Sequence, residues 1–83
     1  MASYYSNTDI YNFSIDFQQR LALMGQSLNK KLQAGMPCSE GFRKLKIASY
    51  LTQVVGRFYN GDSQLENVDC IILKLNNILP KNE

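Results

Sequence analysis

Gly35-Met36-Pro37-Cys38-Ser39 is the stretch that decides the fold, because it separates two long amphipathic segments. Glycine commonly ends a helix in the left-handed conformation, and a small polar residue is a preferred helix cap. A second break, Asn60-Gly61-Asp62-Ser63, separates the second segment from a third. We therefore expect three helices, over about residues 9–34, 39–59 and 63–79.

The first segment has apolar residues at steps of three and four, which indicates one buried helical face. These residues are Ile10, Phe13, Phe17, Leu21, Met24, Leu28 and Leu32. We expect Thr8 or Asp9 to cap this helix and residues 1–8 to be loosely ordered. At ~1.5 Å per residue the helix is longer than the other two can cover. We expect its N-terminal end to overhang.

Residues 11–17 carry a competing pattern, in which apolar and polar residues alternate as they do in a strand. Periodicity alone does not separate the two interpretations. A lone strand would need a partner, and only a second copy of the chain could supply one. We therefore prefer a continuous helix and keep a short strand over residues 11–17 as the alternative.

The second segment is the predicted central helix, with Ser39 as its N-cap. Only Lys44 interrupts its apolar arc, which consists of Val54, Ile47, Phe58, Leu51, Val55 and Ala48. In the third segment Ser63 and Glu66 have the spacing of a capping box, and Pro80 closes the helix. Its stripe consists of Leu65, Val68, Ile72, Leu75 and Leu79. Short connections make neighbouring helices antiparallel, so we predict an all-α three-helix bundle that forms a single domain over residues 1–83.

The composition is that of a globular chain, with 45% hydrophobic and 19% charged residues. At 83 residues a core yields only a modest stability, so we expect a protein partner or a homodimer. The net charge of +2 is too small to indicate nucleic-acid or membrane binding unless the cations cluster. No segment approaches the ~20 apolar residues of a membrane span. We expect a soluble, cytoplasmic protein that does not bind membranes.

The residue inventory gives no sign of catalysis or metal binding. The chain has no histidine, and Cys38 and Cys70 lack metal-ligand spacing, so we predict no metal, no cofactor and no catalytic residues. The carboxylates lie mostly at helix starts, where capping explains them. Antiparallel packing separates the two cysteines by ~20 Å, which is beyond disulfide reach, so we predict two free thiols.

Two surfaces are candidates for binding. Tyr4, Tyr5 and Tyr11 are candidate partner-binding residues, because aromatic side chains are enriched at interfaces. A basic stripe opposite the core of the second helix could bind phosphates or an acidic partner, although an ordinary solvated face also explains it. The stripe consists of Arg43, Lys46, Tyr50, Gln53 and Arg57. Lys30 and Lys31 need no role beyond a favourable interaction with the helix dipole.

Small residues indicate where another helix could approach closely. Gly25 lies in the middle of the first predicted helix, where glycine is unfavourable by ~1 kcal/mol relative to alanine. Ser49, Thr52 and Gly56 form a small-residue strip on the second helix. Close packing of the first two helices explains these residues, and a dimer contact is the alternative.

With a strand at residues 11–17, the order of strand, helix, glycine turn and a second helix opening at Ser39-Glu40-Gly41-Phe42-Arg43 resembles the ribbon-helix-helix DNA-binding family. The resemblance covers residues 11 to about 55. It implies a dimer whose paired strands enter the major groove, with Asn12, Ser14 and Asp16 facing the bases. The long first helix, the position of Asp16 and the extra third helix depart from that pattern.

We therefore consider a small non-enzymatic protein–protein interaction module the leading hypothesis. It would act as an adaptor, chaperone-like subunit or inhibitor and dock through a helical or aromatic surface. Nucleic-acid binding, either of the ribbon-helix-helix type or through the basic stripe, is the alternative. The two differ in the partner they require and in the residues that contact it.

Overall fold

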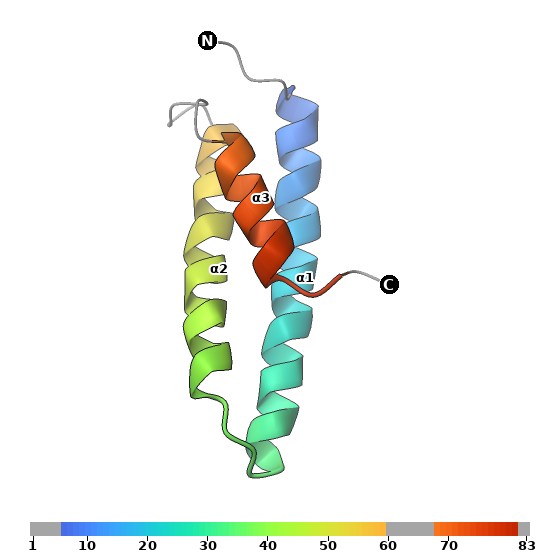
Figure 1. Ribbon diagram of the computed structural model, residues 1–83. Helices are drawn as coiled ribbons and strands as arrows, with labels where there is room; N and C mark the ends of the chain where they lie inside the picture. The colour runs from blue at the N-terminus through green and yellow to red at the C-terminus, as the bar shows by residue number, and fades with distance from the viewer. Residues whose placement is uncertain (1–5, 60–67, 82–83) are drawn as a thin grey trace.

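The computed structural model describes residues 6–59 and 68–81, apart from the side chains of Asn7, Phe58 and Tyr59. The described residues form three helices, α1 (Asn7–Gln33), α2 (Ser39–Tyr59) and α3 (Val68–Ile78), and no strand. Figure 1 shows α1 and α2 as an antiparallel hairpin, and α3 running antiparallel to α2. The predicted all-α antiparallel three-helix bundle is therefore confirmed. The predicted start of the third helix at residue 63 lies outside the described residues.

The first helix begins two residues before the predicted start, because Ser6 caps it. The Ser6 hydroxyl accepts from the Asp9 backbone N–H, and the Asp9 carboxylate accepts from the Ser6 N–H, each at 3.1 Å. This reciprocal pair is a capping box. The prediction that Thr8 or Asp9 is the cap was wrong, since both lie inside α1 and Asp9 acts from the third helical position. Tyr4 and Tyr5 lie outside the described residues.

Residues 11–17 are helical, so the strand alternative was wrong. Ile10, Ser14 and Phe17 are buried at steps of three and four, whereas Tyr11 and Ile15 are exposed. A strand would place Tyr11, Ile15 and Phe17 on one face. Of these three residues, only Phe17 is buried against the core formed with α2 and α3. The paired strand on which the ribbon-helix-helix resemblance depends is therefore absent.

Gly35 ends α1 as predicted. Its φ of +75° lies in the left-handed region, which glycine enters without a Cβ penalty. The Gly35 N–H donates to the Leu32 carbonyl and the Met36 N–H donates to the Lys31 carbonyl, both at 3.0 Å. These two bonds form a Schellman motif, which satisfies carbonyls at the end of the helix. The chain then returns through a short connection to α2.

The start of α2 packs closely on the end of α1. The Phe42 N–H donates to the Cys38 carbonyl at 2.9 Å, which puts Cys38 and not Ser39 in the N-cap position, one residue from the prediction. A Cβ added to Gly41 would overlap the side chain of Leu28, so glycine permits the close approach of the two helices here. An added Cβ at Gly25 would meet nothing within 4 Å. Close helix packing therefore explains Gly41 and does not explain Gly25.

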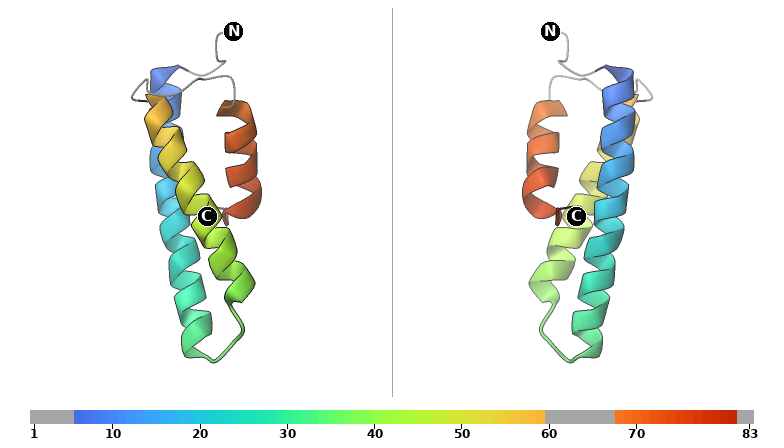
Figure 2. Two further views of the ribbon diagram at one scale, coloured as in Figure 1. Left: turned by 90° about the vertical axis from the view of Figure 1, so that its left-hand side faces the viewer. Right: turned by 90° about the vertical axis from the view of Figure 1, so that its right-hand side faces the viewer.

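The core lies toward one end of the hairpin. Its buried residues are Ile10, Phe17, Ala48, Val55, Val68, Ile72, Leu75 and Leu79. Figures 1 and 2 show α3 alongside the first half of α1 and the second half of α2 only. We call residues 22–47, which extend beyond α3, the open end, and the remaining parts of α1 and α2 together with α3 the closed end.

The expected overhang of the N-terminal end of α1 was wrong. Ile10 and Phe17 near that end are only 2% and 1% exposed, because α3 and the second half of α2 cover them. The uncovered part is instead the open end. There Leu32 and Ile47, both predicted as core residues, are 55% and 46% exposed. The apolar stripe of the hairpin is thus longer than its covering helix.

Candidate functional site

An open groove lies where α3 stops and the hairpin continues, with a volume of about 510 Å³. From α1 it is lined by Leu23, Met24, Ser27, Leu28 and Lys31. From α2 it is lined by Gly41 and Lys44, and from the end of α3 by residues 78–81. We call this site the α3-end groove.

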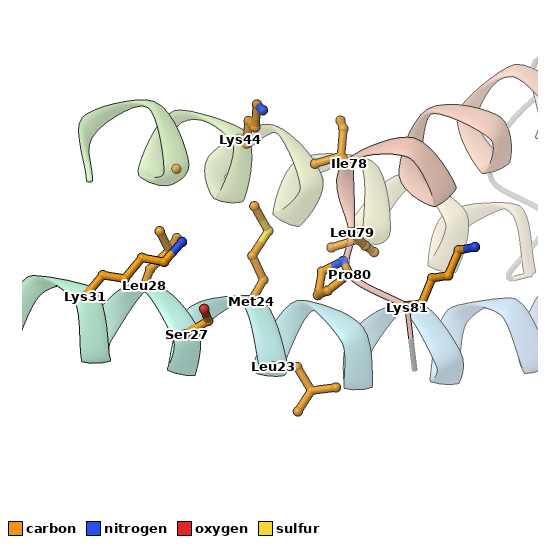
Figure 3. Close-up of a pocket in the computed structure, with 11 residues that line it drawn as sticks. Leu23, Met24, Ser27, Leu28, Lys31, Lys44, Ile78, Leu79, Pro80 and Lys81 are labelled. Atoms are coloured by element: carbon orange, nitrogen blue, oxygen red, sulfur yellow. The ribbon is translucent and has the colours of Figure 1, made fainter. Parts of the chain in front are cut away.

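The floor of the α3-end groove is apolar. Figure 3 shows Met24 extending from α1 toward α2, next to Leu79 and Pro80 at the end of α3. Leu28 and Leu79 are buried, whereas Met24 and Ile78 are half-buried and keep part of their surface open to solvent. Methionine is flexible and fills irregular apolar contacts.

The rim of the groove is positively charged. Lys31, Lys44 and Lys81 are all exposed, and Figure 3 shows them on different sides of Met24. The described residues that line the groove include no carboxylate. The site therefore combines an apolar floor with a cationic border.

Arg20 fixes the position at which α3 ends. Its Nε donates to the Pro80 carbonyl at 2.8 Å, and its Nη2 lies 3.4 Å from the Leu79 carbonyl. Its Nη1 donates to the Asn76 side chain at 2.7 Å and to the Asp16 carboxylate at 3.2 Å. The guanidinium also lies 5.5 Å from the centre of the Phe17 ring. We call these contacts the Arg20 network.

The Arg20 network has a structural reason in the helix terminus. Carbonyls in the last turn of a helix lack intrahelical donors, and Pro80 has no N–H to offer. Arg20 is only 6% exposed and supplies several donors from one planar group, which matches several acceptors at once. A polar hollow of about 400 Å³, lined by Asp16, Arg20, Asn76 and Lys81, lies beside it.

Sequence interpretation missed both the groove and Arg20. The i,i+4 spacing of Asp16 and Arg20 is visible in the sequence, but the carbonyl partner of Arg20 is 60 residues away. Lys44 was visible as the one cation within the apolar arc of α2. It proves to border the groove.

The structure leaves the predicted site residues in separate places. All five residues of the basic stripe are exposed on α2, and none of them lines the groove. Tyr11 is exposed near the start of α1, at the closed end. The stripe, Tyr11 and the groove are therefore three distinct surfaces.

Cys38 and Cys70 are free thiols, the first buried and the second exposed, as predicted. Within residues 6–59 and 68–81 there is no group of three or more His, Cys, Asp or Glu side chains that could hold a metal ion. None of the described helices is both long enough and apolar enough to cross a bilayer.

The fold and the groove define the class of this protein as a small antiparallel three-helix bundle with one apolar, cation-bordered surface. The chain matches no protein-family model, no curated protein and no solved structure at a significant level.

Proposed function

We propose that this chain is a small non-enzymatic protein–protein interaction module whose docking surface is the α3-end groove. The supporting observation is that α3 has only 11 residues and stops before the hairpin does, which leaves Met24 and Ile78 half-buried beside Leu28. Apolar grooves with a charged border are the usual receptors for amphipathic helices. Two free thiols fit a reducing compartment such as the cytoplasm.

The experiment that tests this proposal uses a neutral helical peptide as the probe. The peptide has about twelve residues, with leucine at helical spacing on one face and glutamine elsewhere. Methyl chemical shifts of Met24 and Ile78 should change and saturate as the peptide is added. The methyl shifts of Ile10 and Leu75 in the closed end should stay constant, because those side chains are buried.

Two variants locate the binding to the groove. Met24→Gln should weaken peptide binding strongly, because it puts a polar amide on the groove floor. Leu73→Gln is the matched control, since Leu73 is exposed on α3 outside the groove, and it should bind as the wild type does. Far-UV circular dichroism should show that both variants remain helical. An absence of saturable shifts in the wild type, or equal binding by the two variants, would contradict the proposal.

Tyr11 offers a second, independent contact for a partner or for a homodimer. It is exposed, and aromatic side chains of this kind contribute strongly at interfaces. Replacing each tyrosine with alanine in turn should weaken association without unfolding the domain. The three substitutions are Tyr4→Ala, Tyr5→Ala and Tyr11→Ala. Sedimentation over a range of protein concentrations measures self-association, and unchanged association would remove these residues from the proposal.

Nucleic-acid binding through the basic stripe is the second candidate function, and the exposure of Arg43, Lys46, Tyr50, Gln53 and Arg57 on α2 favours it. Binding to a DNA duplex should then fall steeply with salt and drop when Arg43, Lys46 and Arg57 are changed to glutamine. Salt-independent or undetectable binding would eliminate this candidate. It requires no strand, unlike the ribbon-helix-helix arrangement.

A further inference from the structure

On the basis of the proposed docking function, we infer that the α3-end groove binds a short amphipathic helix of a partner protein that carries acidic residues beside its apolar face. The partner helix would occupy the length of hairpin that α3 leaves uncovered. Three properties of the structure point to this occupant: the length of the uncovered stretch, its charge, and the way in which α3 is stopped.

The length of the open end matches a short helix. At 1.5 Å per residue, the 11 residues of α3 span about 16 Å and the 21 residues of α2 span about 31 Å. About 15 Å of α2 therefore has no third helix beside it, which corresponds to about ten residues, or nearly three helical turns. Leu32, one turn beyond Leu28, continues the apolar surface toward the turn at Gly35.

The open end is much more basic than the chain as a whole. Residues 22–47 contain Lys30, Lys31, Arg43, Lys44 and Lys46 but only one carboxylate, Glu40, whereas the whole chain has a net charge of +2. All six of these side chains are exposed. Two of these lysines, Lys31 and Lys44, border the groove together with Lys81. Because complementary charge guides association and selects among partners, an acidic helix is favoured over a neutral or basic one.

Two features of the structure end α3 at the edge of the groove. Pro80 lacks the N–H needed to continue the helix. Arg20 donates to the Pro80 carbonyl and holds that residue against α1. The end of α3 thereby forms one wall of the groove and does not extend over its floor.

The described helices of the chain itself are poor candidates for the occupant. Each carries at most two carboxylates: Asp9 and Asp16 on α1, Glu40 on α2 and Asp69 on α3. A second copy would also bring its own basic open end. Nucleic acid is a poor fit as well, because the described lining contains no aromatic side chain on which a base could stack. An acidic amphipathic helix of another protein would pack its apolar face on the groove floor and pair its carboxylates with the lysines of the rim.

The test compares three fluorescent peptides that share the leucine face of the neutral peptide. Their flanking positions carry glutamate, glutamine or lysine, and fluorescence anisotropy gives each Kd. The glutamate peptide should bind about tenfold more tightly than the lysine peptide at low salt, and this difference should shrink with added salt. A double variant, Lys31→Glu with Lys44→Glu, should reverse the preference.

The matched control for that variant is Arg57→Glu with Lys74→Glu, which changes the net charge equally at exposed positions outside the groove. It should alter the preference less than the groove variant does when both are compared at 0.15 M salt, where the Debye length is about 8 Å, because neither residue lines the groove. Both double variants are compared by circular dichroism to show that they fold alike.

The outcomes distinguish this inference from the proposed function. If the glutamine peptide binds but the glutamate and lysine peptides bind equally, the acidic occupant is wrong and the docking function stands. If no peptide binds, both fail. A concentration-dependent dimer that Met24→Gln abolishes, or DNA that displaces the glutamate peptide from the groove, would assign the groove to another occupant and overturn the inference.

Discussion

The closed end and the open end of the hairpin are built from the same kind of sequence but reach different degrees of burial. In the closed end Ile10, Phe17, Val55 and Leu75 are almost completely inaccessible to solvent. In the open end Leu32, Met36 and Ile47 are about half exposed. The apolar period continues through both, but α3 lies beside the closed end only. An amphipathic pattern predicts a face, but only a neighbouring element decides whether that face is covered.

The largest expected difference in the free energy of unfolding is between a variant of a core residue and a variant of a groove residue. Phe17→Ala should lower the free energy of unfolding by about 3–5 kcal/mol, because it removes a buried ring and leaves a cavity. Met24→Ala, at the half-buried groove floor, should cost only about 1 kcal/mol. Urea denaturation followed by circular dichroism measures both. Similar losses would mean that the open end is as fully covered as the closed end.

Removing the Arg20 network should have the next largest effect. Arg20→Leu should lower the free energy of unfolding by about 2–3 kcal/mol, since it leaves the acceptors at the end of α3 without charged donors. Hydrogen exchange should show α3 losing protection more than α1 or α2. Arg20→Lys should restore only part of the stability, because an ammonium lacks the planar fork of donors. Unchanged exchange in α3 would contradict this role.

Two glycine variants compare a close contact between helices, at Gly41, with an open surface, at Gly25. Gly25→Ala should raise the free energy of unfolding by about 0.5–1 kcal/mol, because its Cβ enters free space and alanine favours the helix. Gly41→Ala should be about 1–2 kcal/mol less stable than Gly25→Ala, because its Cβ displaces the buried Leu28 side chain. Thermal denaturation orders the two variants. The reverse order would contradict the assigned contact at Gly41.

The smallest effect is expected from the exposed apolar residues of the open end. Leu32→Gln and Ile47→Gln should each change the free energy of unfolding by less than about 0.5 kcal/mol, since neither side chain lies in the core. A loss above about 2 kcal/mol at either position would show that a neighbour covers it in solution. The measurement is made at several protein concentrations, so that self-association would be detected.

Local patterns predicted the helices well, because their signals lie within a few residues of the structure they determine. Gly35 ended α1 as expected, and the stripe of Val68, Ile72, Leu75 and Leu79 is buried. Residues 11–17 are helical despite their alternating pattern. Ile10, Ser14 and Phe17 share the helical face that is buried against the neighbouring helices. The N-caps of α1 and α2 were each misplaced by one or a few residues, since neighbouring residues can also cap a helix.

The candidate site could not be predicted in the same way, because it depends on where α3 stops relative to the hairpin. Pro80 indicated the end of α3, but not which part of α1 lies beside it. Arg20 next to Pro80 and Gly41 next to Leu28 are contacts between residues far apart in the chain or on different helices. One sequence contains no signal for such pairs. The groove follows from them.

The Arg20–Pro80 hydrogen bond also has a kinetic consequence. The turn at Gly35 brings α1 and α2 together after a short loop, whereas the bond from Arg20 to Pro80 joins residues 60 positions apart. Closing the longer loop costs more chain entropy, so we expect the hairpin to form in the folding transition state and α3 to dock afterwards. Loss of the Arg20 network would then accelerate unfolding and leave the folding rate nearly unchanged. The Arg20 network thus lengthens the residence time of α3 on the hairpin, and with it the lifetime of the groove wall.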